Sequence, residues 1–198
     1  MSKADIIPPQ PMEQNRLLTR YLLVILLIPL LVSKLNEIWT KYQAGHIWTT
    51  QNILFDGIII ISYLAMLYFY PQLTPIFKNT HIMTQTELRM TRFLKPGKPI
   101  KINEINRLEF YKSKDKEEKE KLLKIYHERV AELVKTGFKR EDFTNSSENI
   151  IILLSKEKFY QMTPLYPKTF IDKMRKHKPD LLAKQIEMTD NGKRETRL

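Results

Sequence analysis

Apolar residues are concentrated in two long segments within the first 70 residues. Residues 17–33 have the sequence LLTRYLLVILLIPLLVS, and the apolar stripe can be extended to about residue 38. Residues 53–70 have the sequence ILFDGIIIISYLAMLYFY. An apolar stretch of roughly 17–25 residues is long enough to cross the hydrocarbon core of a bilayer as a helix. We therefore predict two membrane-spanning helices, at about 17–38 and 53–70.

The two segments together predict a transmembrane hairpin over residues 17–75, preceded by an N-terminal cytoplasmic tail of residues 1–16. A cleaved signal peptide is the alternative interpretation of the first segment, because basic residues precede an apolar core. Lys34 and Glu37 follow that core in place of a small-residue cleavage site, so we keep both spans. Asp56 is the one charge of the second segment, and is either a functional group or close enough to the interface to reach water.

Lysine and arginine flank the two spans unevenly. The connection between the spans contains Lys34 and Lys41, and the basic residues that flank it on the other side of the spans are Lys3, Arg16, Arg20, Lys78, Arg89, Arg92 and Lys95. Because basic loops are retained on the cytoplasmic side, this asymmetry predicts that both termini are cytoplasmic. We expect a multi-pass protein of the cell inner (plasma) membrane, in contact with the lipid bilayer.

The chain changes character after the second span and alternates between polar and apolar residues. Residues 79–92 alternate in the manner of a strand, with Leu88 and Met90 on one face and His81 and Met83 on the other. This period of two residues predicts an extended segment at the start of a water-soluble domain.

Further periodic segments predict that this domain mixes strands and helices. The predicted elements are a strand at 100–110, an amphipathic helix at about 114–136 ending at Gly137, a strand hairpin at 149–162 and a closing helix at 168–178. We expect an α+β cytoplasmic domain over residues 79–178. The remaining residues, 179–198, are polar and predict a C-terminal tail that frays.

The net charge of the chain indicates the kind of partner it binds. The chain has 33 Lys and Arg against 22 Asp and Glu, a formal net charge of +11. Such a charge is typical of nucleic-acid binding, but beside membrane spans each basic residue gains about 1 kcal/mol from an anionic leaflet. We therefore expect anionic lipid rather than nucleic acid. The candidate lipid contacts are Lys78, Arg89, Arg92, Lys95 and Lys98.

The residues that usually carry catalysis or metal binding form no pattern here. The chain has no cysteine, which excludes thiolate nucleophiles, cysteine-ligated metals and disulfides. Its histidines are scattered over four segments, at His46, His81, His127 and His177. Asn145 begins a glycosylation sequon, which is silent in a cytoplasmic domain. We predict no catalytic, cofactor-binding or metal-binding residue, and no cofactor.

Three features give the chain a family resemblance. They are the polar extended start with Thr84 and Leu88, the stretch PIKINEINRLEFY at 99–111 and the stretch FYQMTPLYPKTFIDKM at 159–174. Placed after two spans, this order resembles the bacterial membrane-anchored proteins with a pleckstrin-homology-like (PH-like) domain, over roughly residues 81–178. The resemblance implies a small antiparallel barrel or sheet capped by a C-terminal helix. The charged helix at 114–135 is an insertion, because the family more often has a short connection there.

The resemblance also implies a function. Domains of this family bind lipids, peptides or proteins, so we expect a non-enzymatic, membrane-anchored PH-like binding or scaffold module at the cytoplasmic face. The alternative is an accessory subunit of a larger membrane complex, with other membrane proteins or further copies of the chain as partners. A lipid-modifying enzyme needs clustered acid and base groups, which the sequence does not show. Nucleic-acid binding is favoured by the charge alone.

Overall fold

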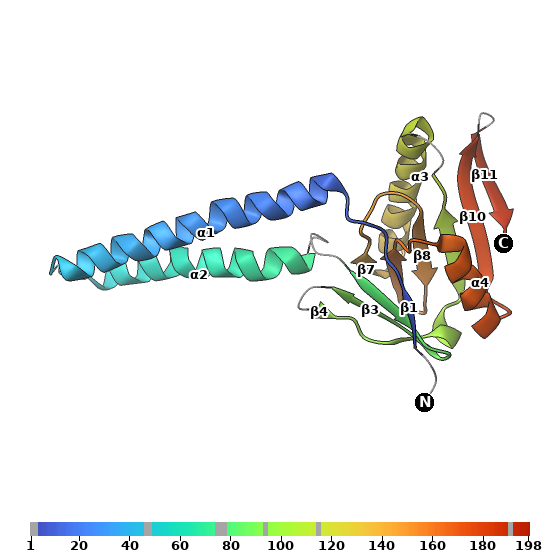
Figure 1. Ribbon diagram of the computed structural model, residues 1–198, viewed down its shortest axis with the longest axis horizontal. Helices are drawn as coiled ribbons and strands as arrows, with labels where there is room; N and C mark the ends of the chain where they lie inside the picture. Colours follow the sequence, from blue (N-terminus) through green and yellow to red (C-terminus); the bar gives the residue numbers. More distant parts are fainter. Residues whose placement is uncertain (1–3, 46–48, 74–78, 93–94, 114–115, 190–191) are drawn as a thin grey trace. The chain divides into compact units, whose positions relative to one another are not determined.

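The computed structural model describes residues 4–45, 49–73, 79–92, 95–113, 116–189 and 192–198. It divides into two compact units (Figure 1). The helical unit consists of Gln14–Ile76, and the sheet unit consists of Met1–Glu13 together with Phe77–Leu198. The α+β class predicted from the sequence is confirmed.

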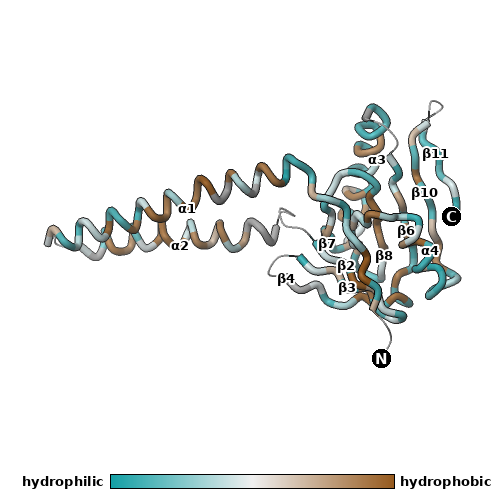
Figure 2. The backbone as a smooth tube through the Cα atoms, in the orientation of Figure 1, coloured by the Kyte–Doolittle hydropathy of each residue, from teal (hydrophilic) through white to brown (hydrophobic). Residues whose placement is uncertain are grey.

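The helical unit contains two long helices, α1 (Gln14–Gln43) and α2 (Thr50–Leu73), which pack against each other. Both are rich in hydrophobic residues, drawn in brown in Figure 2. Within the described residues, one stretch is long and apolar enough to cross a membrane, Gln51–Phe69 of α2. The first predicted span lies within α1, but the side chains of Arg20, Leu23 and Val24 are outside the described residues. Because these residues interrupt the described apolar stretch, the first span stays a prediction.

A five-stranded antiparallel sheet begins the sheet unit. Its strands are β1 (Asp5–Ile7), β2 (Thr80–Met83), β3 (Glu87–Arg92), β4 (Lys95–Pro96) and β5 (Ile100–Lys101). They are ordered β1-β2-β3-β4, with β5 also paired to β3. A short 3-10 helix, η1 (Ile102–Glu104), follows β5.

The prediction of one continuous strand over residues 79–92 is wrong. The chain turns back after β2, where the Thr84 N–H donates to the Glu87 carbonyl (2.8 Å) and the Glu87 N–H donates to the Thr84 hydroxyl (3.0 Å). The turn changes the alternation, so that His81 and Met83 lie on the same buried face as Leu88. Alternation alone does not reveal a turn made by residues that also fit a strand.

A six-stranded mixed sheet completes the unit, with the order β11-β10-β6-β8-β9-β7. Its strands are β6 (Arg107–Tyr111), β7 (Lys139–Phe143), β8 (Ile150–Leu154), β9 (Lys158–Met162), β10 (Leu182–Thr189) and β11 (Gly192–Arg197). The hairpin predicted at 149–162 is confirmed as β8 and β9. Two pairings are parallel, β6 with β10 and β7 with β9, so the sheet is not the purely antiparallel one that the family resemblance implies.

Two helices cover opposite faces of this sheet. The predicted amphipathic helix is confirmed as α3 (Lys116–Lys135), whose Leu122, Tyr126 and Val130 are buried against one face. Gly137, two residues after the end of α3, has a left-handed φ of 91°, and the Phe138 N–H donates to the Leu133 carbonyl (3.0 Å), as in a glycine-capped helix end.

The predicted closing helix is confirmed as α4 (Pro167–His177). Its Phe170, Ile171 and Met174 join a second core, which lies on the other face of the six-stranded sheet and is shared with the five-stranded sheet. α4 is not the last element, because β10 and β11 follow it.

Both segments predicted as tails contain strands. In the segment predicted as an N-terminal tail, residues 5–7 form β1, which pairs with β2. In the segment predicted as a C-terminal tail, β10 and β11 form a hairpin whose first strand lies beside β6. β11 is polar along its length, and its Glu195 pairs with Lys184 of β10 at 2.9 Å. β10 contributes the buried Ala183 and Ile186, but these stand among polar residues and give a weak apolar signal.

Candidate functional site

The helical unit is an insertion into the five-stranded sheet. The chain leaves the sheet unit after β1, forms α1 and α2, and returns to form β2, which pairs with β1 in antiparallel register. The strand on each side of the insertion therefore belongs to one folded unit. This arrangement gives the helices two covalent attachments to the sheet unit.

Both attachments are held by one buried residue, Asn145. Its side-chain oxygen accepts hydrogen bonds from the backbone and side-chain nitrogens of Asn79 (3.0 and 2.9 Å), just before β2. Its side-chain nitrogen donates to the Gln10 carbonyl (3.2 Å), and its backbone carbonyl accepts from the Glu13 N–H (3.1 Å), just before α1. Asn145 is fully buried, so this sequon asparagine is a structural link and not a surface acceptor.

Glu13 adds an ionic link at the same place. Its carboxylate accepts hydrogen bonds from the backbone N–H (2.8 Å) and the hydroxyl of Ser147, and lies 3.5 Å from the ammonium of Lys119. Lys119 also pairs with Glu148 at 3.0 Å. The charged first half of α3 is therefore tied to the segment that precedes α1.

Inside the helical unit, an ion pair joins the two helices. The Asp56 carboxylate of α2 lies 2.8 Å from the Lys34 ammonium of α1, and Asp56 is 7% exposed. Lys34 also pairs with Glu37 at 3.0 Å. The sequence left Asp56 either as a functional group or as a group that reaches water, and the structure shows it buried and paired with Lys34 between the two helices.

The five candidate lipid contacts have different surroundings. Arg89 and Lys98 are exposed. Arg92 is buried with its guanidinium 5.5 Å from the centre of the Phe143 ring, and this burial lowers its pKa, although Asp142 and Glu141 oppose the shift. Arg92 thus packs inside the sheet unit. Lys95 lies in β4 with its side chain outside the described residues, and Lys78 lies outside them altogether.

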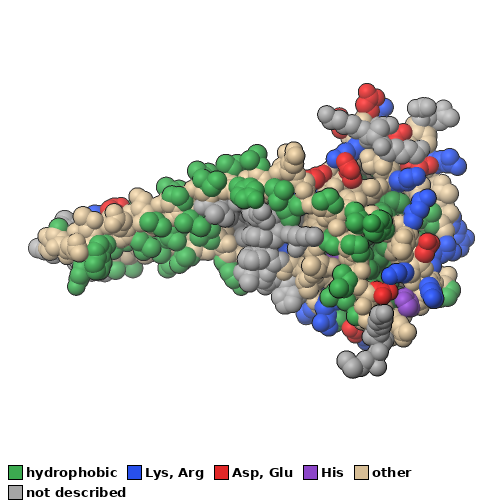
Figure 3. Space-filling view, in the orientation of Figure 1, with side chains coloured by type: hydrophobic (Ala, Val, Ile, Leu, Met, Phe, Trp, Pro, Cys, Tyr) green, Lys and Arg blue, Asp and Glu red, His purple; other side chains and the backbone are tan. Residues whose placement is uncertain are grey.

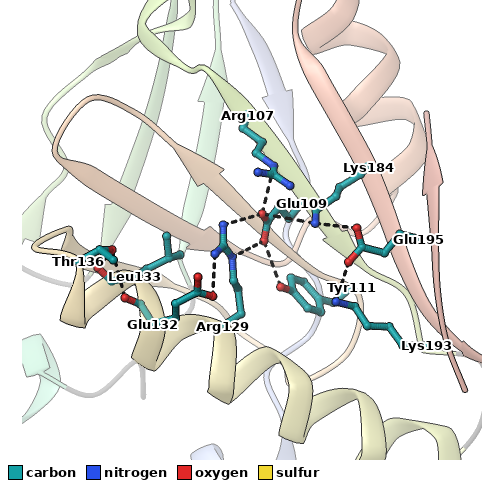
Figure 4. Close-up of polar contacts among 10 residues, drawn as sticks. All are labelled: Arg107, Glu109, Tyr111, Arg129, Glu132, Leu133, Thr136, Lys184, Lys193 and Glu195. Atoms are coloured by element: carbon teal, nitrogen blue, oxygen red, sulfur yellow. Dashed lines mark hydrogen bonds and ion pairs between the residues drawn. The ribbon is translucent and has the colours of Figure 1, made fainter.

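A buried charge cluster that the sequence analysis did not identify surrounds Glu109 of β6 (Figure 4). Glu109 is fully buried and accepts two hydrogen bonds from the Arg129 guanidinium of α3 (3.1 and 3.2 Å). The Tyr111 hydroxyl donates to it at 3.1 Å, and Arg107 and Lys184 lie 3.2 and 3.9 Å away. A charge in the apolar stretch at 108–111 is the signal that points to such a cluster.

The cluster is built to hold charge rather than to transfer protons. Desolvation lowers the pKa of Arg129, but hydrogen bonds to Glu109 and Glu132 outweigh it and raise the pKa overall. Desolvation, then the charge of Glu109, raises the pKa of Tyr111. Both groups thus keep their protons at neutral pH, and the cluster fixes α3 on the sheet.

The described histidines do not converge on one site. His81 is buried in the sheet unit, His127 and His177 are exposed, and His46 lies outside the described residues. Within the described part of the chain, no three histidine or acidic side chains lie close enough together to hold a metal ion.

Comparison of the chain with protein-family models, with curated proteins and with solved structures finds no match. Function is therefore inferred from the geometry of the chain itself.

Proposed function

We propose that the protein is a membrane-anchored, non-enzymatic binding module, in which α1 and α2 span the bilayer and the sheet unit binds its partner at the cytoplasmic face. The observation that carries this proposal is the exposure of apolar side chains around both helices. Ile25 of α1 is 61% exposed and Ile61 of α2 is 67% exposed. Hydrophobic side chains follow the two helices in Figure 3. Exposure of so extended an apolar surface to water is unfavourable, whereas the hydrocarbon core of a bilayer covers it.

The Lys34–Asp56 pair supports the same anchor. An ionisable group in a lipid-facing helix is costly unless it is paired, and a pair between two helices fixes how they face each other. A hairpin held in this way presents its remaining apolar side chains to lipid.

The binding role is the part of the proposal that the PH-like resemblance supports. α4 packs on the sheet as a capping helix does, although β10, β11 and two parallel strand pairs lie outside that family's antiparallel pattern. Arg89 and Lys98 are the candidate contacts for anionic lipid headgroups, since both are exposed.

An accessory subunit of a larger complex is the second candidate, and an exposed apolar group on the sheet unit favours it. Ile6 of β1 is 76% exposed and Tyr166 is 61% exposed. The neighbouring Leu165 N–H donates to the Pro8 carbonyl (2.8 Å), just after β1. Exposed aromatic and aliphatic side chains of this kind favour a protein partner.

Cysteine labelling tests the anchor, because the chain has no native cysteine. Gln43→Cys near the end of α1 and Lys156→Cys in the β8–β9 turn are both at exposed positions. In intact cells an impermeant maleimide is expected to label the first variant and not the second, and both are expected to react after permeabilisation. Labelling of Lys156→Cys in intact cells refutes the proposed orientation, and release of the chain by alkaline carbonate refutes membrane insertion.

The two candidate functions predict different masses for the detergent-extracted protein. A module that acts alone is expected to run in mild detergent at the mass of the chain or a small multiple of it, whereas an accessory subunit co-migrates with other polypeptides. Tyr166→Ser is expected to release those polypeptides without changing membrane insertion.

A further inference from the structure

A cavity of about 160 Å³ lies between the two sheets of the sheet unit. Its buried wall is formed by Met90, Ile100 and Phe143, which come from β3, β5 and β7. An apolar cavity of roughly 150 Å³ accommodates a benzene molecule. The space therefore fits an aromatic ring or a short alkyl group.

The polar residues of the cavity lie on its more exposed side. Lys158 and Glu141 face each other there, with the ammonium 3.4 Å from the carboxylate. Lys98 is exposed and has no ion-pair partner among the residues with described positions. Because Lys158 and Glu141 neutralise each other, Lys98 is the group of these three that favours an anionic ligand group.

Tyr160 supplies a hydrogen-bond donor at the same place. It is half-buried and lines the cavity. Desolvation raises the pKa of Tyr160, and the nearby Glu141 and Glu104 raise it further, so the hydroxyl keeps its proton. A few convergent polar groups around an apolar space are typical of small-ligand sites.

Two close contacts support the walls of the cavity. The ring of Phe143 lies under the guanidinium of Arg92. Gly97, next to Lys98, passes so close to β3 that a Cβ atom there would lie 1.7 Å from the Met90 carbonyl oxygen. The backbone that carries Lys98 is therefore seated directly against the cavity wall, and a preformed site needs little ordering to bind.

We propose that this cavity binds a small amphiphilic anion, with an aryl or short alkyl group against Met90, Ile100 and Phe143 and an acidic group near Lys98 and Tyr160. The inference rests on the binding role proposed above and names the ligand class for it. The acidic group belongs either to a soluble carboxylate or to a membrane lipid, and the experiment separates these two sources.

The test uses the full chain in nanodiscs of zwitterionic lipid, titrated with 4-fluorobenzoate and followed by ¹⁹F NMR. Saturable binding at millimolar concentration is expected, and 4-fluorobenzyl alcohol, which lacks the charge, is expected to bind at least about fivefold more weakly. Absence of saturable binding overturns the proposal, and equal binding of the alcohol overturns its anionic part.

Variants locate the binding. Lys98→Ala is expected to weaken 4-fluorobenzoate binding at least about fivefold, because a charge-assisted contact is lost. The matched control is Lys156→Ala, an exposed lysine outside the cavity lining, which is expected to leave binding unchanged. Ile100→Phe is expected to fill the cavity and abolish binding. If that variant fails to fold, Lys98→Ala and Tyr160→Phe decide the matter, and unchanged binding in both overturns the proposal.

Anionic nanodiscs identify the source of the ligand. If anionic lipid displaces 4-fluorobenzoate from the wild type, the ligand is a lipid, and if binding is unchanged, it is a soluble carboxylate. If the chain binds 4-fluorobenzoate but alkaline carbonate extracts it from membranes, the proposed site is supported and the membrane anchor is refuted. If the chain resists extraction but binds no anion, the anchor is supported and the proposed site is refuted.

Discussion

Gly97 shows how one backbone position controls the junction between the two sheets. A Cβ at this residue would overlap the Met90 carbonyl oxygen at 1.7 Å, a contact that backbone movement alone can relieve. Because the turn after β4 also forms part of the cavity wall, any such movement displaces Lys98 as well. A glycine is therefore required here by close approach, not by an unusual φ angle.

We predict that Gly97→Ala lowers the free energy of unfolding by roughly 2–4 kcal/mol, in the range of severe single substitutions. The control is Gly57→Ala in α2, where a Cβ meets no atom within 4 Å. Alanine is favoured over glycine in a helix interior by about 0.5–1 kcal/mol, so this variant is expected to be neutral or slightly stabilised. Thermal melting of both variants in the same nanodiscs measures the difference, and equal melting temperatures would contradict the steric argument.

His81 is a buried titratable group in the core between the two sheets. It is fully buried in this core. Burial lowers the pKa of His81 from 6.5 to about 4, and the neighbouring Phe143 backbone partly opposes this shift. The folded protein therefore keeps the ring neutral over a pH range in which an unfolded chain protonates it.

The sign of the resulting pH dependence follows from linkage. Between pH 6.5 and 4 the unfolded state binds a proton at His81 that the folded state does not, so stability falls as pH falls through this window. The loss amounts to roughly 3 kcal/mol at most. We predict that His81→Phe flattens the stability curve between pH 6.5 and 4, measured by chemical denaturation at several pH values. His177→Gln, at an exposed position, is the control and is expected to leave the curve unchanged.

At the scale of elements, α3 is attached to the sheet by two kinds of contact. Its apolar stripe, which includes Leu122, Tyr126 and Leu133, is buried on the sheet. Arg129 lies beside that stripe and donates two hydrogen bonds to the buried Glu109 of β6. A carboxylate in such a position depends on its partners, because its desolvation is not otherwise compensated.

We predict that Arg129→Met destabilises the protein by roughly 2 kcal/mol or more, since it removes the two hydrogen bonds and leaves Arg107 and Lys184 as the cations near Glu109. Glu132→Gln is the matched control. The Glu132 side chain is 62% exposed and is the outer partner of Arg129. Its substitution is therefore expected to lower the free energy of unfolding by under about 1 kcal/mol. The double substitution Glu109→Leu with Arg129→Met is expected to recover part of the loss. A double variant less stable than Arg129→Met alone would contradict this account.

At the scale of the whole molecule, the sheet unit is assembled from both ends of the chain. β1 pairs with β2 across the helical insertion, and Lys173 of α4 pairs with Asp5 of β1 at 2.9 Å. β10 inserts between β6 and β11. A fragment limited to residues 79–178 therefore lacks the strands that border β2 and β6.

We predict that residues 79–178 alone fail to fold cooperatively. A chain in which a flexible linker replaces residues 14–76, so that residues 1–13 and 77–198 are kept, is expected to be folded and to melt in one transition. Circular dichroism during heating compares the two proteins. Cooperative melting of the short fragment would show that β1, β10 and β11 are dispensable.

The sequence by itself determined the elements whose signals are local. The two long apolar segments, the amphipathic α3 with its Gly137 end, the β8–β9 hairpin and the α4 face are each visible within about 20 residues of sequence. Hydrophobic periodicity reports such elements directly, because each buries a contiguous face of its own. The same local signals led to the α+β class and to the prediction of membrane spans.

Tertiary structure decided everything that depends on pairing between distant residues. Asn145 bonds to Asn79, 66 positions away, and to Gln10, 135 positions away. β1, β10 and β11 are strands because neighbours bind their backbones, and the few apolar residues in them, such as Ile7 and Ile186, form no long periodic apolar face. Arg92 is buried because Phe143 lies beside it, and the cavity exists because two sheets meet around it. Backbone hydrogen bonds and buried charges are stabilised by partners that lie close only in the folded protein. A local pattern of residue types therefore does not predict them.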